Sequence, residues 1–339
     1  MTTRILRHDR FGPPGEVVRL VEEPDAVPRV GEVAIRVEAA PIHTGDLQNI
    51  AGVKLMLRHV QDGNDLHVPL PQVPGIEGVG RIDAVGPEVT RWRVGDRVYL
   101  PRQCGSWRTR LIADETALLP CPDGDATQLS QMVNAFSAQF ALTDLAPLKP
   151  GDWFVQNGAN SSVGRMVIQL ARRRGIRTLN VVRRPELVPE LEALGADRVF
   201  VDGPDLAARV RTAVGAASLM VALDGVAGAA TGRLAECLSD GGTIANMGTT
   251  SGEPCALPTW MLLYRRIRLV GFYAGFQMNA RSLPERARIM GELAALLGDG
   301  SLRSRIAATY RLDEYPAALA HAARAGRERD GKVTFVMQD

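Results

Sequence analysis

The sequence predicts an α/β protein with two parts, a doubly wound parallel sheet and a second, β-rich domain. Three observations support this prediction. Residues 153–182 read as strand, small-residue turn, amphipathic helix and strand; further short apolar runs suit alternating helices and strands; and the N-terminal third shows alternating strand patterns between frequent Gly and Pro. At 339 residues the chain can build two cores. We expect the β-rich domain at 1–125, completed by about 300–339, and the parallel-sheet domain at 126–299.

Short strands account for most of the predicted N-terminal domain. Residues 33–39 and 80–86 alternate apolar and polar side chains, and residues 95–100 begin with a turn and continue as a strand. Residues 53–74 lack this periodicity and carry several charged side chains among apolar ones. A long segment of that kind is typical of a cover over a binding site.

A polar loop follows the first of these strands. His43, Thr44 and Asp46 lie close together in it and could contact a substrate. For Asp46, an Asx-type turn that opens a short helix is an equally good interpretation.

Residues 153–182 form the unit around which the chain is organised. Residues 153–156 are apolar and β-prone, and small or polar residues make the turn at 157–162. A helix closed by Gly175 follows, and a second strand at 178–182 completes a right-handed βαβ unit. The apolar face of the helix holds Val163, Met166, Val167, Leu170 and Ala171, and the opposite, polar face holds Arg165, Gln169, Arg172 and Arg173.

The turn of this unit predicts a site for a pyrophosphate, because unpaired N–H groups at a helix N-terminus and the helix dipole both favour an anion. Gly158 and Gly164 stand six residues apart, so the pattern differs from G-x-G-x-x-G and is only moderately specific. A βαβ unit that binds no nucleotide is the alternative.

The end of the second strand bears on the identity of the nucleotide. Enzymes that prefer NAD place an acidic residue there to bind the ribose hydroxyls. Here Arg183 and Arg184 follow Val182, which favours the 2′-phosphate of NADPH. The alternative is a pair of solvated surface arginines.

Alternating elements continue after the unit. A helix is predicted at 186–194, and buried strands at 219–223 and 242–247. Because ligands bind at the carboxyl ends of parallel strands, the crevice residues predicted here are Asp224, Met247 and Gly248.

The last part of the chain returns to helices. Residues 282–285 form a capping box that begins a helix ending at Gly298, and a shorter helix runs from Asp313 to Gly326. Residues 332–336 read as a closing strand, which we expect to rejoin the N-terminal domain.

Composition argues against several classes of function. The net charge is +2 with both signs mixed along the chain, so we expect a small-molecule substrate and neither nucleic acid nor a membrane as partner. The first residues form no apolar signal region and no long apolar stretch follows, which predicts a cytoplasmic enzyme. The scattered cysteines predict neither a zinc site nor a disulfide framework; they are Cys104, Cys121, Cys237 and Cys255.

Together these stretches resemble the medium-chain dehydrogenase/reductase superfamily over nearly the whole chain. The resemblance implies a Rossmann domain plus a GroES-like catalytic domain. Residues 156–164, followed by 167–171 and 180–183, look specifically like the 2-enoyl thioester reductases of fatty acid synthesis. Zinc enzymes of the superfamily carry Gly-His-Glu, whereas residues 75–78 read Gly-Ile-Glu-Gly, so the resemblance implies no catalytic metal.

The resemblance also implies a set of NADPH contacts. Asn160 to Val163 would hold the pyrophosphate, Arg183 the 2′-phosphate, and Asn134 would lie near the nicotinamide, where we count it with the catalytic residues. Gly158 and Arg184 join the predicted cofactor residues from the turn and strand-end patterns described above. The remaining predicted cofactor residues are Asn160, Ser161, Ser162, Val163, Met247, Gly248, Phe272, Tyr273 and Lys332. The alternatives are a solvated strand-end position for Lys332 and a core aromatic for Phe272. A homodimer through an edge strand near 269–272 is a further expectation from the superfamily.

One departure concerns the acid of the reaction. The thioester reductases have a tyrosine two positions after the glycine that corresponds to Gly52, and this chain has Lys54 there. His43 and Thr44 replace the family's Asn-Pro, and Gln139 stands where a tyrosine is usual. Lys54 could replace the tyrosine if desolvation lowers its pKa, and His43 is the second candidate.

The predicted function is an NADPH-dependent reductase that delivers hydride to an activated C=C bond of a 2-enoyl thioester or related enone. A zinc-free quinone oxidoreductase is the first alternative, because quinones accept hydride without a dedicated protein acid. A non-catalytic NADPH-binding sensor or structural protein is an alternative of another class.

Overall fold

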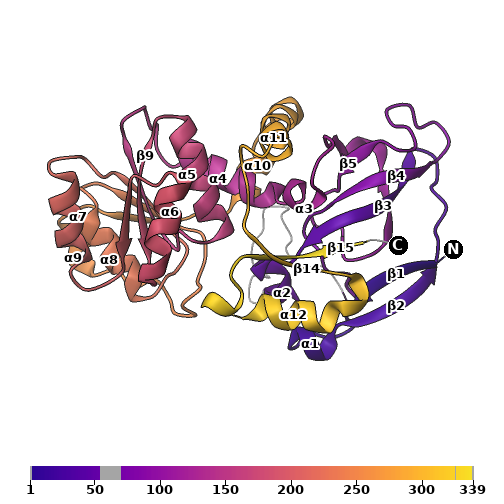
Figure 1. Ribbon diagram of the computed structural model, residues 1–339, viewed down its shortest axis with the longest axis horizontal. Coiled ribbons are helices and arrows are strands. Elements are labelled where there is room, and N and C mark those ends of the chain that lie inside the picture. Colours follow the sequence, from indigo (N-terminus) through magenta and orange to yellow (C-terminus); the bar gives the residue numbers. More distant parts are fainter. Residues whose placement is uncertain (1, 54–69, 325, 338–339) are drawn as a thin grey trace. The chain divides into compact units, whose positions relative to one another are not determined.

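The computed structural model of the chain describes residues 2–53, 70–324 and 326–337 (Figure 1). It divides into two units: Met1–Val133 with Ala287–Asp339, and Asn134–Arg286. We call these the N-terminal unit and the sheet unit. The domain boundaries predicted from the sequence are 1–125 with 300–339, and 126–299. They remain predictions.

The sheet unit is built on a six-stranded parallel sheet with the order β10-β9-β8-β11-β12-β13. The strand order reverses between β8 and β11, which is where a doubly wound sheet binds its ligand. The strands are β8 (Trp153–Asn157), β9 (Arg177–Val182), β10 (Arg198–Val201), β11 (Val221–Asp224), β12 (Thr243–Asn246) and β13 (Arg268–Gly271). The fold class predicted from the sequence is confirmed.

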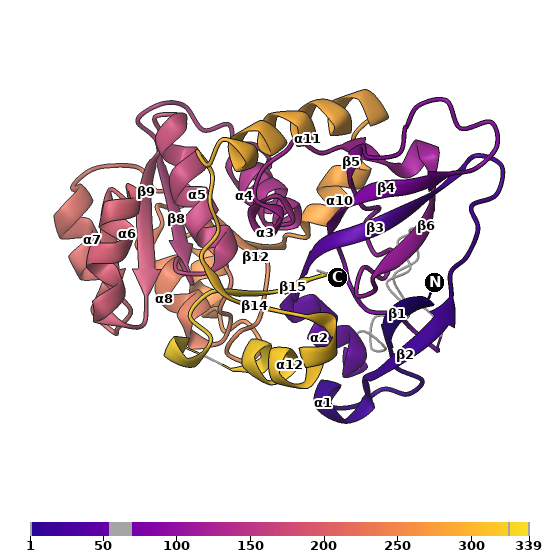
Figure 2. The same ribbon diagram turned by 45° about the vertical axis from the view of Figure 1, so that its right-hand side comes forward.

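Helices cover both faces of this sheet (Figure 2). Leu179 and Val181 of β9 point into a core shared with α7 and α8, whereas Val182 points into a second core with α5 and α6. These helices are α5 (Ser162–Arg173), α6 (Val188–Leu194, after the 3₁₀ turn Pro185–Leu187), α7 (Leu206–Val214) and α8 (Ala229–Cys237). The unit also contains α9 (Thr259–Leu263) and α10 (Ala274–Asn279). Two helices cross the division between the units: α4 (Met132–Asp144) begins in the N-terminal unit, and α11 (Leu283–Gly298) ends there.

The polar face predicted for α5 is exposed only in part. Arg172 and Arg173 are exposed, whereas Arg165 and Gln169 are buried. The Arg165 guanidinium donates to the Asn160 carbonyl oxygen at 3.0 Å and forms an ion pair with Glu190 of α6 at 2.9 Å. The first part of this face is therefore covered, and Arg165 makes its contacts inside the fold.

The N-terminal unit contains a sheet of seven strands in the order β14-β15-β3-β4-β5-β7, with β6 added beside β3, and a separate pair of β1 with β2. The strands are β1 (Thr2–Arg7), β2 (Arg19–Pro24), β3 (Glu32–Pro41), β4 (Val79–Val85), β5 (Arg97–Tyr99), β6 (Arg110–Asp114), β7 (Leu119–Pro120), β14 (Ile306–Tyr310) and β15 (Lys332–Val336). Its helices are α1 (Pro14–Val17), α2 (Thr44–Ile50), α3 (Ala126–Leu129) and α12 (Tyr315–Ala323), with 3₁₀ turns at Glu115–Ala117, Leu312–Glu314 and Gly326–Glu328.

The closing strand β15 pairs antiparallel with β3, as predicted, so the end of the chain completes the N-terminal unit. Phe335 on β15 is fully buried and meets Trp107 edge-on, with ring centroids 5.3 Å apart. Ile35 of β3 and Ile82 of β4 belong to the same core. None of the helices within the described ranges is long and apolar enough to cross a bilayer.

Candidate active site

The turn between β8 and α5 positions the predicted pyrophosphate site. Gly158 adopts a left-handed conformation, with φ at +56°, which lets the chain turn sharply from the strand. Ser161 is the N-cap of α5, and its hydroxyl accepts a hydrogen bond from the Gly164 N–H at 3.1 Å. Apart from the N–H of Gly164, the first N–H groups of a helix have no partner inside it, which favours an anion at this end.

Gly164 brings α5 close to the sheet. A Cβ atom at this position would lie 2.7 Å from the carbonyl oxygen of Ala159. The Gln156 side-chain amide donates to the Gly164 carbonyl at 2.9 Å and to Asn180 Oδ1 at 2.7 Å. These contacts tie the helix N-terminus to β8 and β9.

Arg183 and Arg184 directly follow β9, which ends at Val182. Arg183 is exposed, while Arg184 is partly buried and lies 3.8 Å from Glu186 Oε1. The capped helix N-terminus, the left-handed Gly158 and the adjacent arginines fit a phosphorylated dinucleotide. The individual cofactor contacts of Asn160, Ser161, Ser162, Val163 and the two arginines stay predictions.

Asp224 ties together the carboxyl ends of β8, β11 and β12. Its carboxylate accepts from Asn157 Nδ2 at 2.6 Å, from the Thr231 hydroxyl at 2.6 Å and from Asn246 Nδ2 at 3.2 Å. Although burial opposes ionisation, these hydrogen bonds together with two from backbone N–H groups hold the pKa of Asp224 below its usual range. Asp224 is fully buried, so it shapes the crevice and presents no side chain to a ligand.

The other predicted cofactor residues of this unit lie at strand ends. The Met247 N–H donates to Asp224 O and the Phe272 N–H to Asn246 O, both at 2.8 Å. Phe272 is buried, as the core-aromatic interpretation expects, whereas Tyr273 is partly exposed and packs edge-on against Phe276 at 5.0 Å. Gly248 follows Met247 with a carbonyl that accepts from Asn246 Nδ2 at 2.9 Å.

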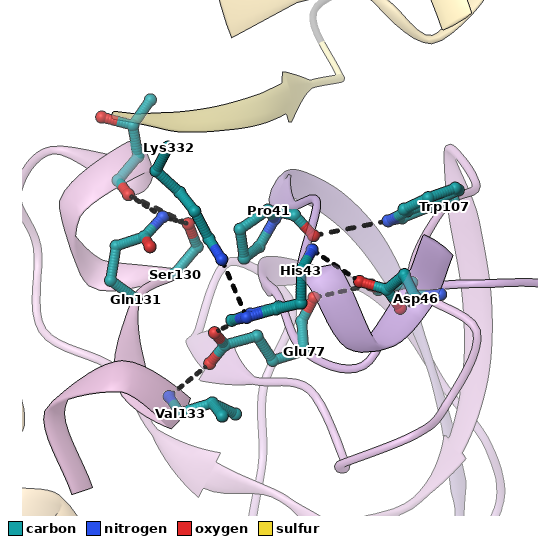
Figure 3. A network of polar contacts seen from close by, with 12 residues as sticks. Pro41, His43, Asp46, Glu77, Trp107, Ser130, Gln131, Val133 and Lys332 are labelled. Atoms are coloured by element: carbon teal, nitrogen blue, oxygen red, sulfur yellow. Dashed lines mark hydrogen bonds and ion pairs between the residues drawn. The ribbon is translucent and has the colours of Figure 1, made fainter. Parts of the chain in front are cut away.

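A second group of polar side chains lies in the N-terminal unit at the start of α2 (Figure 3). Asp46 is buried in the first turn of this helix, as the helix-capping interpretation of the sequence expected. Its carboxylate accepts from the His43 N–H at 2.8 Å and from the Gly75 N–H at 3.2 Å. Asp46 therefore fixes α2 against the segment that leads to Glu77.

The His43 ring lies between an acidic and a basic side chain and contacts both (Figure 3). Its Nε2 lies 2.7 Å from Glu77 Oε1, and its Nδ1 lies 2.8 Å from Lys332 Nζ. The second carboxylate oxygen of Glu77 accepts from the Val133 N–H at 2.6 Å. We call Glu77, His43 and Lys332 the buried triad.

Burial dominates the protonation of the buried triad. It holds the pKa of His43 well below its usual range, with help from the charge on Lys332. Burial raises the pKa of Glu77 to about 8 despite the Val133 N–H, and lowers the pKa of Lys332 to about 8 despite the charges of Glu77 and Asp46. His43 is therefore neutral near pH 7, which argues against its predicted role as an acid that gives up its own proton.

The structure thus changes the view of several predicted residues. Lys332 is paired and partly buried, so the interpretation as a solvated strand-end lysine is wrong. Asn134 is buried directly after Val133 on α4, and its predicted role near the nicotinamide stays a prediction. Lys54 lies outside the described residues. Glu77 was missed as a functional residue, although a carboxylate between glycines ahead of a buried strand was a signal for it.

Within the described part of the chain, no three His, Cys, Asp or Glu side chains come together in a way that could hold a metal ion. Cys104, Cys121, Cys237 and Cys255 are all free thiols.

Comparison with known proteins gives consistent matches. The family model for zinc-binding dehydrogenases matches residues 162–288, and that for the alcohol dehydrogenase GroES-like domain matches residues 29–123. The chain is similar to the mitochondrial enoyl-[acyl-carrier-protein] reductase of Caenorhabditis elegans, with 33% identity over 99% of this chain and 96% of that protein.

Two solved structures share the fold. A Bacillus thuringiensis protein assigned as an NADPH:quinone reductase superposes with a TM-score of 0.88 at 25% identity, covering 100% of both chains. The complex of Etr1p with NADP and crotonyl-CoA superposes with a TM-score of 0.87 at 20% identity, covering 99% of this chain and 100% of that one.

Proposed function

This chain belongs to the medium-chain dehydrogenase/reductase superfamily, with enoyl-acyl-carrier-protein reductases among its relatives, and from that premise we propose that it is an NADPH-dependent reductase of 2-enoyl thioesters. The observation that carries the proposal is the match to an enoyl reductase along almost the full length of both chains. The paired arginines after β9 and the capped N-terminus of α5 support NADPH as the cofactor.

When bound, NADPH supplies a hydride to the β-carbon of the activated C=C bond. The turn at Gly158 and the N-terminus of α5 would bind the pyrophosphate, and Arg183 the 2′-phosphate. Met247, Gly248 and Tyr273 would border the path of the cofactor, since they follow the carboxyl ends of β12 and β13. Hydride addition places negative charge on the thioester oxygen, and a preorganised donor there would stabilise the resulting enolate.

A quinone reductase is the second candidate function. The structural match to the assigned NADPH:quinone reductase favours it, because that match covers both chains completely. A quinone needs no dedicated acid from the protein, which is consistent with Lys54 at the position of the family tyrosine.

A homodimer is the assembly that we propose. It would form through β13, which is the last strand of the parallel sheet and exposes Leu269 and Val270. An unpaired sheet edge with apolar side chains is a ready surface for a second copy.

NADPH oxidation by the purified protein tests the function. A short 2-enoyl-CoA and a 1,4-quinone would be offered separately, with NADH as the cofactor control and with Lys54→Ala beside the wild type. We expect turnover of the thioester with NADPH. Turnover of the quinone alone, unchanged in the variant, would leave the second candidate standing, and NADPH binding with no turnover on any acceptor would favour a non-catalytic protein.

A further inference from the structure

The buried triad is a continuous chain of hydrogen bonds that ends in a carboxyl group on one side and an amine on the other. Glu77 and His43 are both buried, whereas Lys332 as a residue is only partly buried. Its two links, at 2.7 and 2.8 Å, are short enough for proton transfer along them. Three separate stretches of sequence, at α2, before β4 and at β15, supply its members.

With one proton between Glu77 and Lys332, two arrangements satisfy this hydrogen-bonded chain without moving a heavy atom. In the ion-pair form, the Lys332 ammonium donates to Nδ1 of His43, and Nε2–H of His43 donates to the Glu77 carboxylate. In the neutral form, the Glu77 carboxyl donates to Nε2, and Nδ1–H donates to the Lys332 amine. The Val133 N–H donates to the other oxygen of Glu77 in both forms, since that oxygen remains an acceptor.

A third arrangement, with both Glu77 and Lys332 protonated, breaks the chain. A neutral imidazole offers one N–H and one lone pair, so it cannot accept from both neighbours at once. Protonating His43 instead is opposed by its burial, which lowers its pKa. Glu77 and Lys332 therefore hold at most one proton between them, and when they hold none the neutral Lys332 amine can still donate to Nδ1.

Burial acts against the ion-pair form. It disfavours the charge on both Glu77 and Lys332, which raises the pKa of Glu77 and lowers the pKa of Lys332. Of the other charged groups near Lys332, Asp46 favours the ammonium form and Arg329 opposes it.

We propose that the buried triad is the proton source of the reduction, with Lys332 as its acid and with His43 and Glu77 as residues that position and tune the Lys332 proton. The acid role rests on the proposed function. After the C–H bond to the β-carbon has formed from the hydride, the electron pair of the enolate forms a C–H bond at the α-carbon with a proton from Lys332 Nζ, and the N–H bond breaks. The amine that remains takes a proton from solvent water.

Glu77→Gln is the variant that tests the link from Glu77 through His43 to Lys332. The amide has the shape of the carboxyl, and its oxygen can still accept from the Val133 N–H. Its NH₂ group then donates to Nε2 of His43, which forces the imidazole proton to Nδ1, facing Lys332. An ammonium cannot accept that hydrogen bond, so the variant should lower the pKa of Lys332.

Nuclear magnetic resonance of lysine labelled at Cε reads this effect directly, because the chain contains only Lys54, Lys149 and Lys332. The Lys332 signal would be assigned with Lys332→Arg and titrated in the wild type, in Glu77→Gln and in Glu292→Gln, an exposed control on α11. We expect Glu77→Gln to lower the Lys332 midpoint by about one pH unit or more, and the control to leave it unchanged. An unchanged midpoint in Glu77→Gln would overturn the relay.

The pH profile of kcat at saturating NADPH tests the acid role. Because the acid must be protonated, activity should fall as pH rises through the Lys332 midpoint, and the fall should begin earlier in Glu77→Gln. At a pH above both midpoints the variant should be slower by about ten-fold for every pH unit that separates its midpoint from that of the wild type. Lys332→Arg keeps the charge but retains its proton, so it should lose kcat.

A kcat profile that does not move with the Lys332 midpoint would overturn the acid role. If the wild type reduces no enoyl thioester, the proposed function fails and the acid role fails with it, whereas the lysine titration still decides whether the triad shares a proton. The two failures are therefore distinguishable.

Discussion

At the scale of single residues, buried carboxylates organise both units of this chain. Asp224 holds the ends of three strands in the sheet unit, and Asp46 joins α2 to the segment before Glu77 in the N-terminal unit. Each carboxylate accepts at least one backbone N–H, which keeps a buried charge satisfied. Asp224 and Asp46 thus hold the backbone segments that carry the predicted site residues.

Asp46→Asn tests this positioning role. The amide can accept one of the two N–H groups but places its own NH₂ against the other, so a buried donor loses its partner. We expect a loss of about 1–3 kcal/mol in the free energy of unfolding, measured by denaturant titration. Asp9→Asn at an exposed site is the control and should change stability little. Equal stability of the two variants would contradict the role given to Asp46.

Arg183→Ser tests the cofactor preference. A charge-assisted hydrogen bond contributes roughly 1.5–3 kcal/mol, so removing the guanidinium should lower the ratio of kcat/KM for NADPH over NADH by about ten-fold or more. Arg184→Ser is the matched comparison; we expect a smaller change, because Arg184 lies near Glu186. If Arg183→Ser leaves the ratio as it was, Arg183 does not bind the 2′-phosphate.

At the scale of elements, the contact of α5 with the turn before it shapes the predicted pyrophosphate site. Gln156 and Asn180 lie within the buried sheet. Their side-chain amides form hydrogen bonds to α5 and to neighbouring strands. Gly164 allows the helix to come this close. The site depends on the backbone of these elements more than on any single side chain.

Gly164→Ala should disturb this contact. The added methyl group would stand 2.7 Å from the Ala159 carbonyl oxygen, so α5 must shift away from the turn. We expect a loss of about 1–3 kcal/mol in stability, together with weaker NADPH binding measured by fluorescence titration. Gly291→Ala in α11 is the control, because a Cβ atom there meets nothing within 4 Å and alanine favours a helix. Similar NADPH binding by both variants would count against the proposed site.

Local pattern was sufficient to predict most of these elements. The strands at β8 and β9, the helix α5 and the capping box of α11 follow from periodicity and end signals that lie within each segment. The burial of Arg165 does not follow from local pattern, because it depends on an ion pair with Glu190, which belongs to α6. The buried triad was missed for the same reason, since three distant stretches assemble it.

At the scale of the whole molecule, the order of the chain explains how each unit is completed. The N-terminal unit closes only when β15 pairs with β3, so the last described strand belongs with the first part of the chain. Lys332 is the first residue of β15 and brings its amine to His43 through this pairing. A truncation before β15 would therefore remove both a sheet strand and one end of the triad.

The proposed homodimer is a prediction about assembly. β13 is the edge strand of the parallel sheet, and its Leu269 and Val270 are 37% and 40% exposed. Apolar side chains on an unpaired edge favour association, because pairing buries them and satisfies backbone groups of the strand. Sedimentation velocity should show a dimer for the wild type and a monomer for Val270→Lys, which places a charge at the edge. Val94→Lys, at an exposed site of the N-terminal unit, should stay dimeric. A monomeric wild type would rule out the dimer, and a dimer that persists in Val270→Lys would place the interface elsewhere.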